Sequence, residues 1–317
     1  MAKKQDAGAV NDSPSSAGHL LGQLIGDWYE EYFAAPLLKD VAKRLGLYLD
    51  SRFESRHSTV RGEKIVWKDY DENGVDYDFV IELGGSASYR GEPVGFFETF
   101  WRRGARHSKD KARDDSGKLV PMRATYPTAR VLGIVSAGDF TEPARELVKS
   151  RNIELFYVPK DKIVAAWKMH GITIDYIDKL EEEKKLKLAM GAKSKLSKKG
   201  IKKEIANSLI ELVGNSSIES FKNLLIGKLG AAPQEYRITL KASSEPIVYF
   251  RHLDVQKFLS GSQPKREFNN LSFSLEVVFS DGDSYIGDEL SWEEMQKDFN
   301  RLTKLINHME NLAKNTV

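Results

Sequence analysis

Two runs of the chain, Asp76-Tyr-Asp-Phe-Val-Ile-Glu-Leu83 and Pro93-Val-Gly-Phe-Phe-Glu-Thr-Phe-Trp-Arg-Arg103, decide the fold that we predict. Each run is rich in β-branched and aromatic residues, which favour strands. Each run also carries an acidic residue between apolar neighbours, Asp78 in the first and Glu98 in the second. Carboxylates on neighbouring strands can hold a hard divalent cation through oxygen. The two runs therefore predict a metal site on a sheet.

The composition is that of an ordinary globular protein of one or two domains: of 317 residues, 41% are hydrophobic and 30% are charged. The formal net charge is only +2, so a nucleic-acid signal has to come from local clusters of Lys and Arg. The absence of cysteine excludes disulfides and thiolate metal sites and favours a reducing cytoplasm. No apolar run approaches the ~20 residues of a membrane span, and the first residues lack the apolar core of a signal peptide. We therefore expect a cytoplasmic protein with no membrane partner.

The order of the predicted elements indicates an α/β fold. An amphipathic helical region over Leu20–Leu49, interrupted near Pro36, precedes a hairpin of strands Glu63–Asp69 and Tyr77–Leu83. Because side chains alternate along a strand, one face of the second hairpin strand should carry Asp76, Asp78, Val80 and Glu82. The elements that follow are the strands Val94–Trp101, Val131–Ser136 and Ile153–Val158 and the helices Thr141–Ser150 and Lys160–Met169. We predict a mixed central sheet flanked by helices.

The composition changes near Asp178, and we predict a domain boundary there. Residues 1–17 lack an apolar pattern and are expected to be disordered, residues 18–178 form the first domain, and residues 179–317 form a C-terminal α+β domain. The lysine-rich run Lys193–Lys203 follows the boundary and has acidic residues near it, which is typical of a solvated surface. The C-terminal elements are the helix Ile205–Leu229, the strands Tyr236–Leu240, Ile247–Phe250 and Leu271–Phe279, a turn at Ser280–Asp283, and the helix Trp292–Leu312 with Ser291 and Glu294 as its capping box.

Asp78 and Glu98 suit Mg²⁺, which keeps several waters and takes only one or two protein carboxylates. A cation held in this way acidifies an attacking water, positions a phosphate and relieves charge on the leaving oxygen, as phosphodiester hydrolysis requires. Leaving the two acids unpaired between apolar residues would be costly. The alternative is that each acid pairs with a nearby arginine in a structural ion pair.

The order of these residues, over Leu20–Asp178, resembles the PD-(D/E)xK nuclease superfamily, whose largest group is the type II restriction endonucleases. The resemblance implies a restriction-endonuclease-like core. It gives Asp78 the role of the first acid and Glu98 that of the second, with the carbonyl of Thr99 as a further metal ligand. It also implies that Glu30 or Glu31 is the auxiliary acid of the family's first helix.

The chain departs from the family pattern at one position. The family places a Lys two residues beyond the second acid, where this chain has Phe100. Some members of the superfamily relocate such residues, so we expect the cation to come from Arg102, Lys109 or Lys111. Arginine is a poor proton acceptor and suits a phosphate clamp, whereas either lysine is better suited to orienting water.

A basic segment with few compensating acids follows the second strand and is partly predicted as a short helix. It predicts phosphate contacts with DNA through Arg102, Arg103, Arg106, His107, Lys109 and Lys111. The resulting hypothesis is a Mg²⁺-dependent endonuclease of double-stranded DNA. Its likeness to restriction enzymes implies a homodimer and a cognate DNA methyltransferase, with the C-terminal domain serving DNA recognition or dimerisation. The alternatives are a catalytically inactive DNA-binding protein on the same fold and an interaction protein that uses its long C-terminal helix.

Overall fold

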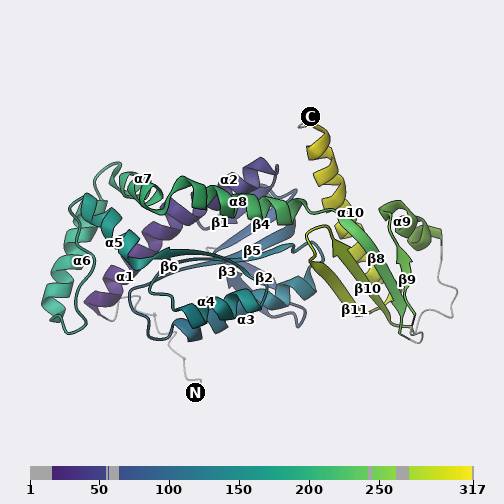
Figure 1. Ribbon diagram of the computed structural model, residues 1–317, viewed down its shortest axis with the longest axis horizontal. Coiled ribbons are helices and arrows are strands. Elements are labelled where there is room, and N and C mark those ends of the chain that lie inside the picture. The colour runs from purple at the N-terminus through teal and green to yellow at the C-terminus, as the bar shows by residue number, and fades with distance from the viewer. Residues whose placement is uncertain (1–15, 55, 57–63, 242–244, 262–270, 316–317) are drawn as a thin grey trace, which may run out of the picture.

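A five-stranded mixed sheet lies between two layers of helices in the computed structural model, which describes residues 16–54, 56, 64–241, 245–261 and 271–315 (Figure 1). The strand order is β1-β4-β5-β6-β7. β1, β4 and β5 pair antiparallel, whereas β5, β6 and β7 pair parallel. The bounds are β1 Tyr48–Ser51, β4 Phe79–Leu83, β5 Glu92–Arg102, β6 Val131–Gly138 and β7 Glu154–Pro159. The prediction of an α/β fold with a mixed central sheet flanked by helices is confirmed.

The first helical region consists of α1 Ala17–Tyr29, the π-helical segment η1 Glu30–Ala34 and α2 Ala35–Arg44. Pro36 is tolerated because it lies at the start of α2, next to the π-helical segment. The prediction of helix as far as Leu49 is wrong, because Gly46 adopts a left-handed conformation (φ +60°) and the chain then enters β1. Of the predicted disordered segment, residues 1–15 lie outside the described residues, and Ser16 caps α1 by accepting a hydrogen bond from His19 N–H at 3.2 Å.

The predicted hairpin is present, but its second strand differs. β2 Ile65–Lys68 pairs with β3 Gly74–Tyr77 in a separate two-stranded sheet. The extended run is interrupted at Asp78, after which β4 joins the central sheet. The expectation that Asp76, Asp78, Val80 and Glu82 share one face of a single strand is therefore wrong, since they belong to different sheets or to the break between them.

Two hydrophobic cores form on the two faces of the central sheet. α3 Ser108–Thr125 and α4 Glu142–Ser150 cover one face together with the β2–β3 hairpin. The other face packs against α1, α2 and α5 Lys160–Met169 (Figure 1). α3 is much longer than the short helix predicted from the basic segment, and it continues through Pro121.

The core that contains α1 and α2 extends beyond residue 178. α6 Glu182–Leu196, α7 Ile201–Val213 and α8 Asn215–Gly230 contribute buried residues to the same core as α1 and α2. A third core begins near Ala231. It lies in the sheet β11-β10-β8-β9 and two helices, with bounds β8 Pro233–Leu240, β9 Ile247–Tyr249, α9 His252–Gly261, β10 Phe273–Phe279, β11 Ser284–Leu290 and α10 Trp292–Asn315. The domain boundary after residue 178 stays a prediction. Near residue 231 the chain passes from the core that contains α1 and α2 to the third core.

α10 starts with the predicted capping box. Ser291 Oγ accepts a hydrogen bond from Glu294 N–H at 3.2 Å, and Ser291 N–H donates to Glu294 Oε2 at 2.8 Å. Across residues 16–54, 56, 64–241, 245–261 and 271–315, no helix has both the length and the apolar character that crossing a membrane requires.

The turn between β10 and β11 connects the third core to the central sheet. Arg130 holds Asp281 with two hydrogen bonds of 2.9 and 3.0 Å and lies over the ring of Phe279 at 3.5 Å. Asp283 contacts Lys228 Nζ at 2.8 Å. Arg130 is only 5% exposed, so the Arg130–Asp281 ion pair is shielded from water. It fixes the turn against the start of β6, which Arg130 directly precedes.

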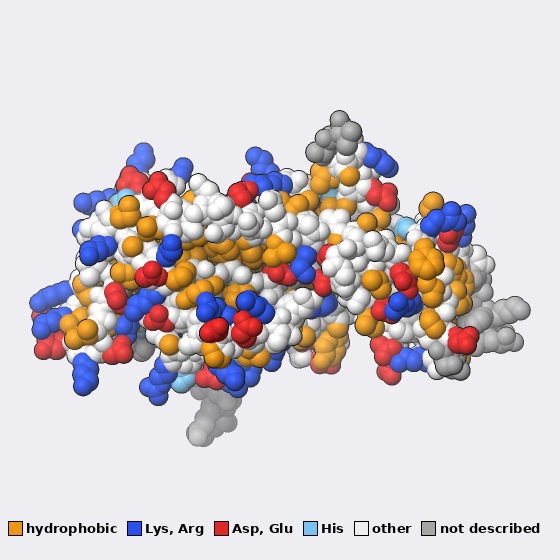
Figure 2. Space-filling view, in the orientation of Figure 1, with side chains coloured by type: hydrophobic (Ala, Val, Ile, Leu, Met, Phe, Trp, Pro, Cys, Tyr) orange, Lys and Arg blue, Asp and Glu red, His pale blue; other side chains and the backbone are white. Residues whose placement is uncertain are grey.

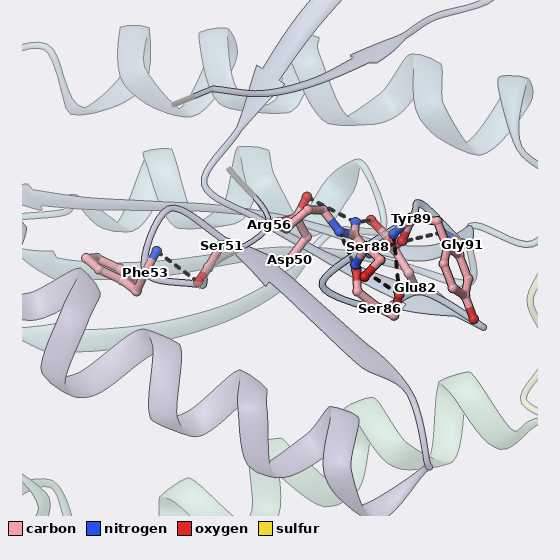
Figure 3. Close-up of polar contacts among 9 residues, drawn as sticks. All are labelled: Asp50, Ser51, Phe53, Arg56, Glu82, Ser86, Ser88, Tyr89 and Gly91. Carbon is pink, nitrogen blue, oxygen red and sulfur yellow. Dashed lines mark hydrogen bonds and ion pairs between the residues drawn. The ribbon is translucent and has the colours of Figure 1, made fainter. Parts of the chain in front are cut away.

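A buried ionic cluster lies at the outer edge of the central sheet. Arg56 Nη1 lies 2.5 Å from Glu82 Oε1 and 3.3 Å from Asp50 Oδ2, and all three residues are 0% exposed. The guanidinium also donates to the carbonyls of Ser86 and Tyr89, each at 2.7 Å. Figure 3 shows the arginine between the two acids and the loop that precedes β5. Glu82 is thus committed to a structural ion pair.

Candidate active site

Asp78 lies in the break between β3 and β4, where it reaches β5. Its Oδ2 accepts hydrogen bonds from Thr99 N–H at 2.6 Å and from Thr99 Oγ1 at 2.9 Å. Phe79 pairs with Phe97 in the antiparallel register of β4 and β5, so the next position in that register puts Asp78 opposite Glu98. Residues directly opposite each other in such a pair have Cβ atoms about 4.5–5.5 Å apart. The register therefore brings the two predicted acids side by side.

Glu98 is 3% exposed and faces α3. Its Oε1 lies 3.3 Å from Nζ of Lys118, a residue in the second half of α3. Burial is the main reason that the pKa of Glu98 rises to about 8, and the negative charges of Asp78 and Asp115 add to it. Lys118 lowers this pKa but does not cancel the rise. The Glu98 carboxylate therefore needs further positive charge to be ionised at neutral pH.

Glu30 is the first residue of η1 and lies on the other side of Asp78. Arg52 Nη2 contacts Glu30 Oε2 and Asp27 Oδ1, each at 2.8 Å. Burial, followed by repulsion from Asp78, raises the pKa of Glu30 to about 8, although Arg52 opposes the rise. Glu30 Oε1 is buried and has no hydrogen-bond partner among the described residues. Asp78 thus lies between two carboxyl groups that resist ionisation.

Phe100 occupies the position of the family's lysine, and its side chain is part of a core. Its ring packs edge-on against Phe140, with the ring centroids 5.0 Å apart. Lys111 Nζ lies 5.5 Å from the centroid of the Phe100 ring and 2.6 Å from Oδ1 of Asp115. Asp115 is fully buried, its Oδ2 has no partner among the described residues, and burial raises its pKa. Lys111 is therefore near Glu98, as expected, but Asp115 holds its ammonium group.

The other predicted basic residues do not converge on the acids in this way. Arg103 forms an ion pair with Asp178 and donates to Tyr176 O at 3.0 Å, so it joins the end of β5 to the segment before α6. His107 lies 3.1 Å from Asp110 at the start of α3. Three residues form no ion pair with a described residue and stay candidates for DNA contacts: Arg102, Arg106 and Lys109.

A cavity of about 440 Å³ opens beside Asp78. Its lining includes three acidic and two basic residues, in which Arg52 pairs with Glu30 and Lys64 with Asp76, beside Asp78. Mixed charge of this kind suits a phosphate group that approaches together with a cation. The cavity makes Glu30 and Asp78 accessible, whereas Glu98 lies buried outside its lining.

The donor atoms fit a cation that needs few protein ligands. Among the described residues, no group of three or more His, Asp or Glu side chains is placed to hold one metal ion. Asp78 and Glu98 could provide the one or two carboxylates that Mg²⁺ usually takes, with water as its other ligands. Burial raises the pKa of Glu98 to about 8, so a cation beside it would favour its ionised form. Glu30 can assist on the other side of Asp78, whereas Glu31 is turned away and contacts Lys202 Nζ at 3.4 Å.

Lys118, Asp115 and Arg52 are site residues that the sequence interpretation missed. Lys118 follows Gly117 and precedes Pro121, two residues that disfavour helix, so the basic segment predicted only a short helix. A spacing signal was nevertheless present. Lys111, Asp115 and Lys118 recur at steps of four and three residues and so lie on one face of α3.

Comparisons of the chain with protein-family models, with curated proteins and with solved structures found no match. The functional interpretation therefore depends on the geometry around Asp78 and Glu98.

Proposed function

We propose that the protein is a Mg²⁺-dependent endonuclease that hydrolyses phosphodiester bonds of double-stranded DNA on a core like that of type II restriction endonucleases. The observation that carries the proposal is the position of Lys118 Nζ, 3.3 Å from Glu98 Oε1 in a site that also holds Asp78. Two acids and one lysine are the groups that the resemblance requires, with the lysine supplied by a helix and not by the strand. The strand order, antiparallel up to β5 and parallel after it, supports the same proposal.

Each side chain has a distinct role in this proposal. Asp78 and Glu98 hold the metal, and Glu30 assists beside Asp78, because a cation there favours its ionised form. A bound Mg²⁺ supplies a more acidic water and relieves charge on the leaving oxygen. Burial lowers the pKa of Lys118, but the charge and hydrogen bond of Glu98, with nearby acids, together raise it above its usual value, so Lys118 stays protonated. Lys118 therefore stabilises negative charge on the attacked phosphate and is not the group that accepts a proton from water.

The test is cleavage of duplex DNA with Mg²⁺, with and without a chelator, by the wild-type chain and the Asp78→Ala and Glu98→Ala variants. We expect both substitutions to reduce cleavage by at least about 100-fold, because each removes a metal ligand. Glu31→Ala is the matched control, since Glu31 lies in the same helical segment as Glu30 but contacts Lys202. Cleavage that survives in Asp78→Ala, or that needs no divalent cation, would contradict the proposal.

A catalytically inactive DNA-binding protein is the second candidate, and Phe100 is the observation that favours it. The residue fills a core beside Phe140 and supplies no cation from β5. Salt-sensitive DNA binding without cleavage by the wild-type chain, in either Mg²⁺ or Mn²⁺, would establish this candidate in place of the first. A homodimer belongs to the nuclease proposal only, because cutting both strands requires two cuts, which a symmetric dimer can make. The cognate methyltransferase also belongs to that proposal only.

A further inference from the structure

The turn between α6 and α7 presents a dense group of lysines. The run Lys193–Lys203 contains six lysines and no acidic residue. In the first half of α6 each lysine has an acidic partner three or four residues before it: Lys184, Lys185 and Lys187 lie 3.2, 2.7 and 2.8 Å from Glu181, Glu182 and Glu183. Lys198, Lys199 and Lys203 are exposed and form no ion pair with a described residue. The nearest acid is Glu204, whose Oε1 lies over Gly200, so the turn carries more positive charge than this one carboxylate offsets.

The backbone of this turn is well fixed. Lys198 N–H donates to Lys195 O at 3.1 Å, and Gly200 has a φ of +86°, a conformation that glycine adopts at little cost. Trp28 Nε1 donates to the carbonyl of Lys202 at 2.9 Å and ties the start of α7 to α1. The lysine side chains therefore project from a turn whose position is set before any partner binds.

The start of α7, which follows the turn, contacts the helical segment that carries Glu30. Lys202 Nζ contacts Glu31 Oε2 at 3.4 Å, and Glu31 follows Glu30 in η1. α6 forms the left end of the molecule in Figure 1, with α7 above it, and Figure 2 shows both basic and acidic side chains projecting from that end. Lys202 thus links the lysine-rich turn to the helical segment that also carries Glu30.

We propose that the α6–α7 turn is a surface for the DNA phosphate backbone, with Lys198, Lys199 and Lys203 binding phosphates of the duplex whose scissile bond enters the Asp78–Glu98 site. The identity of the partner rests on the proposed function. Lysines bind DNA phosphates regardless of base sequence, and binding releases counterions. An anionic membrane fits less well, because interfacial helices also bury an apolar face, and the turn exposes no large apolar side chain.

The experiment measures DNA binding by the full chain in an Asp78→Ala background without a divalent cation, so that cleavage does not contribute. Fluorescence anisotropy with a labelled 20-base-pair duplex gives Kd at several salt concentrations. Lys198→Ala/Lys199→Ala/Lys203→Ala is compared with Lys149→Ala/Lys184→Ala/Lys187→Ala, which removes the same charge from exposed lysines that are already paired. Thermal unfolding of both variants checks that they fold.

We expect the first triple variant to flatten the slope of log Kd against log salt by about 2 to 3, since each phosphate contact contributes about 0.9. The control triple variant should change it little. An equal change in both variants, or no change in either, overturns the proposal. Loss of binding to vesicles of phosphatidylserine and phosphatidylcholine, with DNA binding intact, would overturn it in favour of a membrane surface. Cleavage by the unmodified chain is assayed separately, so a protein that binds through this turn but never cuts DNA contradicts only the proposed function.

Discussion

Lys118 Nζ on α3 lies 3.3 Å from Glu98 Oε1 on β5, and Tyr77 OH at the end of β3 donates to Lys118 O at 2.8 Å. One hydrogen bond thus ties the strand that precedes Asp78 to the helix turn that carries the lysine. The position of Lys118 relative to both acids is therefore set by the packing of α3. Because the lysine comes from α3, the β5 position of Phe100 can be occupied by a core side chain.

Lys118→Ala should reduce DNA cleavage by about 100-fold or more, because it removes charge stabilisation from the attacked phosphate. The side chain is partly exposed, so we expect little change in the unfolding temperature. Lys118→Arg should retain part of the activity, since it keeps the charge but alters its geometry. Arg113→Ala is the control on the same helix, since Arg113 is exposed and already pairs with Asp110. Comparable loss in Arg113→Ala, or full activity in Lys118→Ala, would remove Lys118 from the site.

Phe100→Lys should destabilise the protein and should not increase activity. The substitution removes the contact with Phe140 and places a charged group in a core, at a cost of about 3 kcal/mol or more. Urea unfolding measures the loss, and DNA cleavage by the remaining folded fraction measures activity. Phe100→Leu, which keeps the position apolar, is the control and should lose less stability. A more active and equally stable Phe100→Lys variant would show that the strand position still needs its lysine.

The free energy of unfolding should depend on pH through Glu98. Its pKa is about 8 in the folded protein, above its usual value near 4.5, so the folded state binds the proton more tightly than the unfolded state does. Its contribution to stability is therefore fully present below about pH 4.5 and is lost as pH rises towards 8, at up to about 1.4 kcal/mol per pH unit.

Glu98→Gln removes this pH-dependent contribution. The free energy of unfolding of the variant minus that of the wild type should therefore rise as pH increases from 5 to 8. Urea unfolding at pH 5, 6.5 and 8 gives the comparison, in buffer without divalent cations. A difference between the two proteins that does not vary with pH would mean that Glu98 is already ionised throughout this range.

Arg56→Met should cost about 3–5 kcal/mol of stability, because it removes the buried guanidinium that contacts the carboxylates of Asp50 and Glu82. Chemical unfolding measures the loss. Arg44→Met is the control, since Arg44 also pairs with two acids but is solvent-exposed, and it should have little effect. Similar losses in the two variants would mean that burial does not decide the strength of the Arg56 cluster.

The Arg130–Asp281 ion pair should couple the third core to the central sheet. A double-mutant cycle with Arg130→Met and Asp281→Asn should give a coupling energy of about 1–3 kcal/mol, since the two residues touch and the arginine is buried. The measurement is urea unfolding of the wild type, both single variants and the double variant. Additive single effects would show that the turn between β10 and β11 is held by other contacts.

The fold could be predicted where periodicity and caps were strong. The run of apolar, β-prone residues in Val94–Trp101 predicted β5 almost to its ends, and Thr141 before Pro143 predicted the start of α4. The interruption at Asp78 could not be predicted, because nothing in the local sequence distinguishes a single strand from two strands in different sheets. That choice is made by the packing of Tyr77 and Phe79 into different cores.

The candidate site could be predicted only in part. Asp78 and Glu98 each lie in a strand-like run of the sequence. Successive strands often pair antiparallel as neighbours, as β4 and β5 do, and this places the two acids close together. Arg52 and Lys118 reach the acids from a turn and a helix that are distant in sequence, so only tertiary packing reveals them. In the same way, the acidic residues near Lys193–Lys203 suggested an ordinary solvated surface. In the folded chain Glu181, Glu182 and Glu183 pair with lysines of α6, and Lys198, Lys199 and Lys203 form no ion pair with a described residue.

The π-helical segment Glu30–Ala34, closed by a bond from Ala35 N–H to Glu30 O, makes this region intolerant of insertions and deletions. Removing one residue would restore ordinary α-helical winding, but it would turn everything before the deletion by about 100° relative to everything after it. Glu30 and the apolar face of α2 could then not both keep their orientations. Homologous chains that share this site should therefore differ here by substitution and not by length.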